Sequence, residues 1–195
     1  QKIFNPLQMA NSFVFTYKDT LSATTSFTYN GTFWNNDFLD ITYGDKNIYS
    51  TPQDLLKWDQ ALYTDQLINS VLLDSAFAPH SFEKPSIHNY GLGWRLQLLP
   101  NGKKVVYHFG KWHGFNASFA RLIDEKATII ILGNKLNRSI YGSASKCYDI
   151  FGDYMQTRQP QNDDSENPEA TVKETKKETK STSPAKPKAD VKKRR

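Results

Sequence analysis

The chain has 195 residues and carries 25 Lys and Arg against 20 Asp and Glu, a net charge of +5 at pH 7. Residues 171–195 hold ten Lys and Arg and three acidic residues, a net +7, which leaves −2 for residues 1–170. The folded part is therefore not expected to bind nucleic acid. No apolar run approaches the roughly 20 residues that span a bilayer, so no transmembrane segment is predicted.

Composition divides the chain into a domain over residues 1–157 and a tail over residues 158–195. The tail has no aromatic residue and is rich in Lys, Glu, Pro, Ser and Thr. Such a segment cannot bury enough apolar surface to offset the entropy of ordering, so we expect it to be disordered. Its basic end, Lys192-Lys193-Arg194-Arg195, can contact a polyanion, but the interspersed acidic residues favour a solvated terminus.

Residues 11–47 are predicted to form an extended surface layer that bears aromatic side chains. The stretch is rich in Asn, Thr, Tyr, Phe and Gly and lacks helical periodicity. Turn signals stand at residues 30–31 and 43–45, and short strands are possible between them.

A helix is predicted over residues 51–62, where Thr51 can cap and Pro52 suits the first helical position. Spacings of three and four residues place its apolar side chains on one inward face, namely Leu55, Trp58, Ala61 and Leu62. A second, shorter helix is predicted over residues 70–77.

The following part of the chain predicts an antiparallel meander. After a polar loop over residues 78–89, alternation and apolar runs indicate four strands, over residues 91–99, 104–109, 115–123 and 128–132. The last run is continuously apolar and is predicted to be buried on both faces, after a hairpin connection at residues 124–126. An amphipathic helix over residues 143–155 is predicted to pack across the sheet, which gives an α/β protein of the α+β type.

Polar residues gather between two apolar strand-like runs, and such a cluster usually faces a site. The cluster contains His108-Phe109-Gly110 and continues through Lys111 and Trp112. Upstream stand Ile48-Tyr49-Ser50-Thr51 at the helix entry and then Tyr90-Gly91-Leu92-Gly93-Trp94. In this order the segments resemble the C-terminal half of the serine β-lactamase and penicillin-binding-protein-like hydrolases, which include class C β-lactamases and D-alanyl-D-alanine carboxypeptidases.

The resemblance implies a partial β-lactamase-like domain and a role for each residue of the cluster. The third active-site motif of that family reads Lys-Thr-Gly or His-x-Gly, so His108 would line the pocket where other members have Lys. The backbone N–H of Lys111 would be one of two oxyanion-hole donors. Phe109, Gly110 and Trp112 would contact substrate, with Gly110 allowing close approach. Phe109 replaces a common Thr or Ser, which removes a hydroxyl that can bind a substrate carboxylate.

The first two motifs of the family, Ser-x-x-Lys and Tyr-x-Asn, are missing from their expected places. No Tyr-x-Asn string occurs, and within residues 1–157 Ser-x-x-Lys occurs only at residues 81–84 and 143–146. Pro85 follows the first string, where a helix cannot continue normally, and the second comes after the third motif. Neither is expected to supply the nucleophile. We therefore expect a fragment, inactive and poorly folded on its own.

The full enzyme implied by the resemblance would acylate a Ser with a small-molecule or peptide substrate and then hydrolyse the acyl-enzyme. Members of the family commonly act in the periplasm or outside the cell. The alternative is a non-catalytic module that binds glycan or peptide through an aromatic surface made of Phe33, Trp34, Tyr43 and Trp112.

Four histidines lie within a short span and raise the question of a metal site, namely His80, His88, His108 and His113. Zinc ligands usually come with Cys or as a helical i, i+4 pair, whereas His108 and His113 are separated across Gly110, which is expected to lie in a turn. No metal or cofactor is predicted. Cys147 is the only cysteine, so no intrachain disulfide can form.

Overall fold

A computed structural model of the protein describes residues 2–42, 44–82 and 86–156. The predicted disordered tail, Tyr43 and the end of the first Ser-x-x-Lys string lie outside the described residues. The predicted domain boundary after residue 157 therefore stays a prediction. Within the described ranges, no helix is both long and apolar enough to cross a membrane.

A five-stranded antiparallel sheet forms the centre of the fold, in the order β3-β4-β5-β6-β7. The strands are β3 (His88–Tyr90), β4 (Arg95–Leu98), β5 (Lys104–Trp112), β6 (Phe115–Leu122) and β7 (Ala127–Gly133). Each strand pairs with the next along the chain, which confirms the predicted antiparallel meander.

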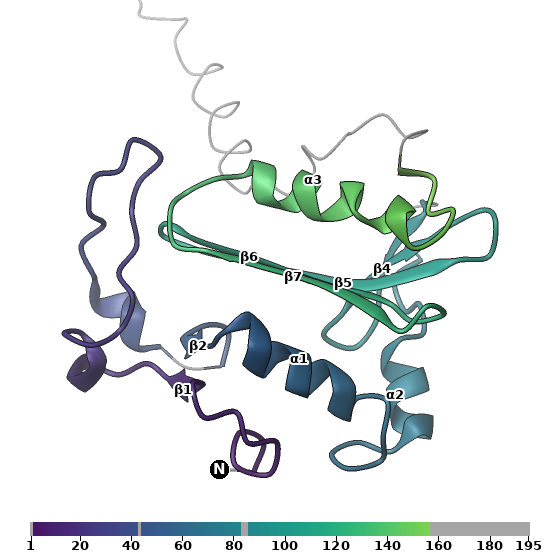
Figure 1. The fold of residues 1–195 in the computed structure, drawn as a ribbon, viewed down its shortest axis with the longest axis horizontal. Helices are drawn as coiled ribbons and strands as arrows, with labels where there is room; N and C mark the ends of the chain where they lie inside the picture. Colours follow the sequence, from purple (N-terminus) through teal and green to yellow (C-terminus); the bar gives the residue numbers. More distant parts are fainter. Residues whose placement is uncertain (1, 43, 83–85, 157–195) are drawn as a thin grey trace, which may run out of the picture. The chain divides into compact units, whose positions relative to one another are not determined.

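Helices cover both faces of this sheet (Figure 1). Helix α3 (Ser139–Lys146) lies on one face, and α1 (Pro52–Ala61) and α2 (Ser70–Ala76) lie on the other. The predicted C-terminal helix packed on the sheet is thus confirmed. The predicted helices over residues 51–62 and 70–77 are also confirmed, with Pro52 in the first turn of α1 and Thr51 accepting a hydrogen bond from the Asp54 N–H.

Two apolar clusters fill the space between sheet and helices, because side chains alternate along β5. Tyr107 faces α3 and belongs to a cluster that includes Leu122, Tyr148 and Tyr154. Val106 faces the other way, toward a cluster that contains Leu96 of β4 and residues of α2 and of the ends of α1 and α2, namely Leu62, Leu73 and Phe77. Odd-numbered side chains of β5 therefore face the α3 side of the sheet, and even-numbered ones face the side of α1 and α2.

The N-terminal segment is attached to α1 through a buried carboxylate. The short strands β1 (Phe13–Val14) and β2 (Ile48–Tyr49) pair with each other, as the predicted extended layer allows. Buried Asp54 accepts hydrogen bonds from the Asn11 N–H at 2.7 Å and the Ser12 hydroxyl at 3.0 Å. Burial alone would raise the pKa of Asp54, but these bonds and the Lys57 ammonium hold it below its ordinary value.

Three strand predictions were wrong in their extent. The predicted polar loop contains β3, and residues 91–94 form the turn that joins β3 to β4, where Gly93 has a φ of 75°. Strand β5 runs through Gly110 to Trp112, so Gly110 lies inside a strand, and the turn comes later, at His113 with a φ of 50°. The turn at residues 91–94 and the extension of β5 both involve Gly residues, and these are hard to assign from sequence because Gly fits a strand edge as well as a turn.

Two predictions near the C-terminus also need correction. The apolar run of β7 is half-buried rather than buried on both faces, because β7 lies at the edge of the described sheet. The last helix begins at Ser139 and ends at Lys146, not at residue 155. Beyond it a short 3-10 turn, η3 (Tyr148–Ile150), leads into a loop, where the Asp149 carboxylate accepts from the Tyr154 N–H at 2.9 Å in place of a helical carbonyl.

Candidate functional site: the open edge of β5

Strand β5 is paired on both sides over only part of its length. Strand β4 pairs with residues 104–107, whereas β6 pairs with residues 105–112 in an unbroken register. In the described part of the chain, no strand pairs with residues 108–112 on the β4 side. Gly110 and Lys111 are exposed there. The predicted site residues therefore lie on a strand edge that can exchange backbone hydrogen bonds with a ligand.

The register shows which backbone groups point to this open side. The Leu98 N–H donates to the Ile87 carbonyl at 2.6 Å on the β3 side, so its neighbour Gln97 directs its backbone groups toward β5. Gln97 is paired with Val105. The backbone groups of Val105 therefore point toward β4, and those of every second residue after it point to the same side. The N–H and C=O of Lys111 thus point to the open side.

His108 is held at the start of this open edge. Its Nδ1 lies 2.7 Å from the Phe109 carbonyl oxygen, and its Nε2 lies 2.9 Å from the Tyr90 hydroxyl at the end of β3. The rings of Tyr90 and His108 meet edge to face, with centroids 6.2 Å apart. Sequence reasoning placed Tyr90 in one of the segments of the family resemblance but did not predict its contact with His108, because that contact depends on the register of three strands.

Phe109 and Gly110 contact the α3 layer. The ring of Phe109 lies 4.5 Å from the ring of Tyr141 and 5.0 Å from that of Tyr107. The Tyr141 hydroxyl donates to the Gly110 carbonyl at 3.0 Å, and a Cβ at Gly110 would meet that of Ala117 at 3.3 Å. The substrate-binding roles of Phe109 and Gly110 stay predictions.

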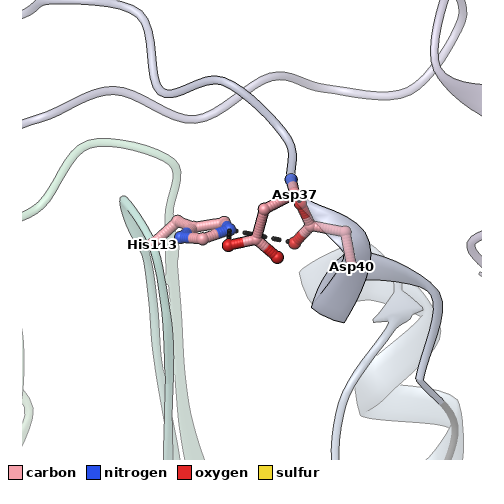
Figure 2. A group of neighbouring side chains, drawn as sticks. All are labelled: Asp37, Asp40 and His113. Atoms are coloured by element: carbon pink, nitrogen blue, oxygen red, sulfur yellow. Dashed lines mark hydrogen bonds and ion pairs between the residues drawn. The ribbon is translucent and has the colours of Figure 1, made fainter.

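Trp112 and His113 contact a pair of aspartates from a segment far upstream, as Figure 2 shows for His113. The Nε2 of His113 is 3.0 Å from Asp40 Oδ1 and 3.8 Å from Asp37 Oδ2. The Trp112 indole N–H donates to the same Asp40 oxygen. The Trp34 ring lies tilted against His113, with centroids 5.2 Å apart. These contacts fix residues 34–40 against the turn that follows β5.

Asp37, Asp40 and His113 have ligand atoms within 4.8 Å of one another, the spacing of a candidate metal site. The carboxylates already have protein partners. Asp40 accepts from Trp112 and from the Asp37 N–H at 2.5 Å, and Asp37 accepts from the Leu39 N–H at 2.7 Å. The cluster is explained as a link between two segments, and the prediction of no metal stays a prediction.

The second Ser-x-x-Lys string lies within α3. That helix covers the sheet face opposite α1 and α2 (Figure 1). Val106 points away from α3, and His108 shares its side of β5 by alternation. That Ser143 is not the nucleophile stays a prediction.

A sequence profile described as beta-lactamase matches residues 1–142. The chain belongs to the beta-lactamase family. A relative in this family, penicillin-binding protein 4* of Bacillus subtilis (strain 168), is 37% identical over 107 residues, which cover 55% of this chain and 24% of that protein. The chain thus spans about a quarter of the relative's length.

Solved structures share the fold at low sequence identity. The penicillin-binding protein of Bacillus halodurans matches with a TM-score of 0.63 and 20% identity, over 74% of this chain and 46% of that one. The octameric penicillin-binding protein homologue of Pyrococcus abyssi matches with a TM-score of 0.59 and 17% identity, over 69% of this chain and 32% of that one. Both likenesses confirm a partial β-lactamase-like fold.

Proposed function

We propose that the chain forms the substrate-binding wall of a serine hydrolase that forms and hydrolyses an acyl-enzyme on a lactam, D-alanyl peptide or ester substrate. The observation that carries this proposal is the open edge of β5. Lys111 is exposed on this edge, directly after the motif His108-Phe109-Gly110, and the register supports an N–H that points to the unpaired side. An N–H at that position can stabilise the oxyanion of an acyl-transfer intermediate.

In the proposed reaction this chain supplies an oxyanion donor and substrate contacts, and another part of the polypeptide supplies the nucleophile. Lys111 supplies one oxyanion donor through its backbone, and Gly110 lets the substrate approach the strand. His108 contributes a polar side chain at the start of the edge, and Trp112 lies at its far end. We propose that the Ser-x-x-Lys and Tyr-x-Asn motifs come from polypeptide outside these 195 residues, and that the chain alone is inactive. The family resemblance supports action outside the cytoplasm.

The aromatic-surface alternative rests on Phe33, which is 49% exposed. Trp34 and Trp112 are half-buried and lie tilted against His113, at centroid distances of 5.2 and 4.7 Å. Tyr43 lies outside the described residues.

The proposal is tested by reading the coding DNA upstream of residue 1 and assaying the protein that it encodes. We expect a continuous frame with Ser-x-x-Lys followed by Tyr-x-Asn, and hydrolysis of a chromogenic lactam, a D-alanyl-D-alanine peptide or a nitrophenyl ester. A start codon directly before residue 1, together with no hydrolysis by the product, would exclude the enzymatic interpretation.

A further inference from the structure

His108 has a defined proton arrangement, which follows from its two partners. A backbone carbonyl can only accept a hydrogen bond, so the contact between Nδ1 and the Phe109 oxygen requires a proton on Nδ1. In the neutral imidazole Nε2 then carries no proton and accepts from the Tyr90 hydroxyl, 2.9 Å away. Tyr90, His108 and the Phe109 carbonyl thus form a chain of two hydrogen bonds that ends on the open edge of β5.

Tyr90 is itself fixed by contacts that do not involve His108. It is the last residue of β3 and is paired with Arg95 on β4. The Arg95 guanidinium lies over its ring, with Cζ 5.7 Å from the centroid. The Tyr90 carbonyl accepts from the His80 N–H at 2.9 Å. The phenol is therefore anchored through its backbone and its ring, which leaves the hydroxyl to hold the imidazole.

We propose that Tyr90 is a positioning residue that fixes the tautomer and the ring orientation of His108 at the open edge of β5. This inference rests on the proposed function, because it names the residue through which the His of the third motif is oriented. With Nε2 bound to Tyr90, the ring stays turned along the strand edge and the Nδ1 proton stays on the Phe109 carbonyl. The Lys111 N–H and C=O are then the next backbone groups along that edge that a substrate can pair with.

Removal of the Tyr90 hydroxyl should free His108 to change its tautomer and ring orientation. In Tyr90→Phe the ring and its contact with Arg95 remain, but Nε2 loses its donor. A hydrogen bond of typical strength shifts an equilibrium about fivefold, so the proton should redistribute between Nδ1 and Nε2. The folded structure should persist, because the substitution removes one partly exposed oxygen.

The test is nitrogen NMR of the imidazole in the protein encoded by the complete reading frame, at roughly pH 8, where an ordinary histidine is neutral. For the unchanged chain we expect His108 to show a protonated Nδ1 and an unprotonated Nε2. Tyr90→Phe should raise the share of the Nε2–H form about fivefold. The matched control Tyr29→Phe, at an exposed loop tyrosine, should leave the His108 signals unchanged.

The proposal is overturned if His108 carries its proton on Nε2 in the unchanged chain, or if Tyr90→Phe leaves the tautomer unaltered. Hydrolysis is a separate arm, measured on the protein encoded by the complete reading frame. A fall in kcat/KM for Tyr90→Phe, but not for Tyr29→Phe, supports the positioning role, and equal activity of the two variants counts against it. Absence of hydrolysis in every variant rejects the proposed function, and the NMR result still decides the role of Tyr90.

Discussion

At the scale of single residues, the open edge of β5 makes a prediction about Lys111 that separates its backbone from its side chain. Its N–H points to the unpaired side, so proline can replace it without breaking a sheet hydrogen bond. Lys111→Pro should lower the kcat of the complete enzyme about 10²–10³-fold, the usual effect of losing one oxyanion donor. Lys111→Ala keeps the N–H and should retain most of the activity.

Steady-state kinetics with a chromogenic lactam or ester measures this effect, and urea unfolding shows whether both variants are folded. Equal activity of folded Lys111→Pro and Lys111→Ala would mean that the amide is not an oxyanion donor.

Asp54 predicts a dependence of stability on acid pH. Because its pKa in the folded protein is lowered, the carboxylate contributes stability above the ordinary value of 3.8, and this contribution is lost as the pH falls below that value. Asp54→Asn should therefore be less stable than the unchanged chain at pH 7, and the difference should shrink below pH 3.8.

Urea unfolding at several pH values provides the measurement. The control Asp74→Asn changes an exposed aspartate of α2 and should behave like the unchanged chain. A difference for Asp54→Asn that stays constant with pH would show that the carboxylate charge is not responsible.

At the scale of elements, a buried ion pair joins β6 to α1. The Arg121 side chain is fully buried, and its Nε donates to Asp59 Oδ1 at 2.5 Å. Removing one partner of such a pair leaves an uncompensated buried charge, so Asp59→Ala should cost about 3–5 kcal/mol of unfolding free energy. Replacing both partners with apolar residues, Asp59→Leu with Arg121→Met, should restore most of that loss.

Chemical denaturation of the single and double variants distinguishes the two effects. A double variant as unstable as Asp59→Ala would show that the pair is needed for more than charge compensation.

The elements also show how far the sequence can predict this protein. The cap at Thr51 and the alternation of β6 depend on neighbours in the chain, and both were predicted. Strand β3 has only three residues and little apolar character, so no periodicity marks it. Glycine at position 110 fits a turn and a strand edge equally well, and only the pairing with β6 decides between them.

For the candidate site, too, local features were predicted from the sequence and long-range contacts were not. The motif at residues 108–111 was found from local order and resemblance. The partners of His108 and His113 were not found, because Tyr90 and Asp40 reach them through strand register and through contacts between distant segments. Sequence spacing carries no signal for either contact.

At the scale of the whole molecule, β7 ends the described sheet with an apolar edge strand. Only β6 pairs with it in the part of the chain that the structure describes, and Leu132 is 36% exposed. Long apolar edges pair with other chains, so the 195-residue chain should self-associate through β7. Leu132→Lys should reduce this association, because a charge on an edge strand opposes pairing.

Light scattering against protein concentration measures the effect. The control Leu92→Lys alters a more exposed leucine in the β3–β4 turn and should leave association unchanged. Equal suppression by both variants would point to net charge rather than to the β7 edge.

The central claim is that this chain supplies one wall of an active site whose nucleophile lies elsewhere. Mass spectrometry of the complete gene product after incubation with a labelled penicillin tests it most directly, because the technique locates the acylated residue. The claim predicts an adduct on the Ser of a Ser-x-x-Lys motif outside these 195 residues, and a slower yield of adduct in Lys111→Pro. An adduct on Ser143, or the same yield in Lys111→Pro as in Lys111→Ala, would contradict it.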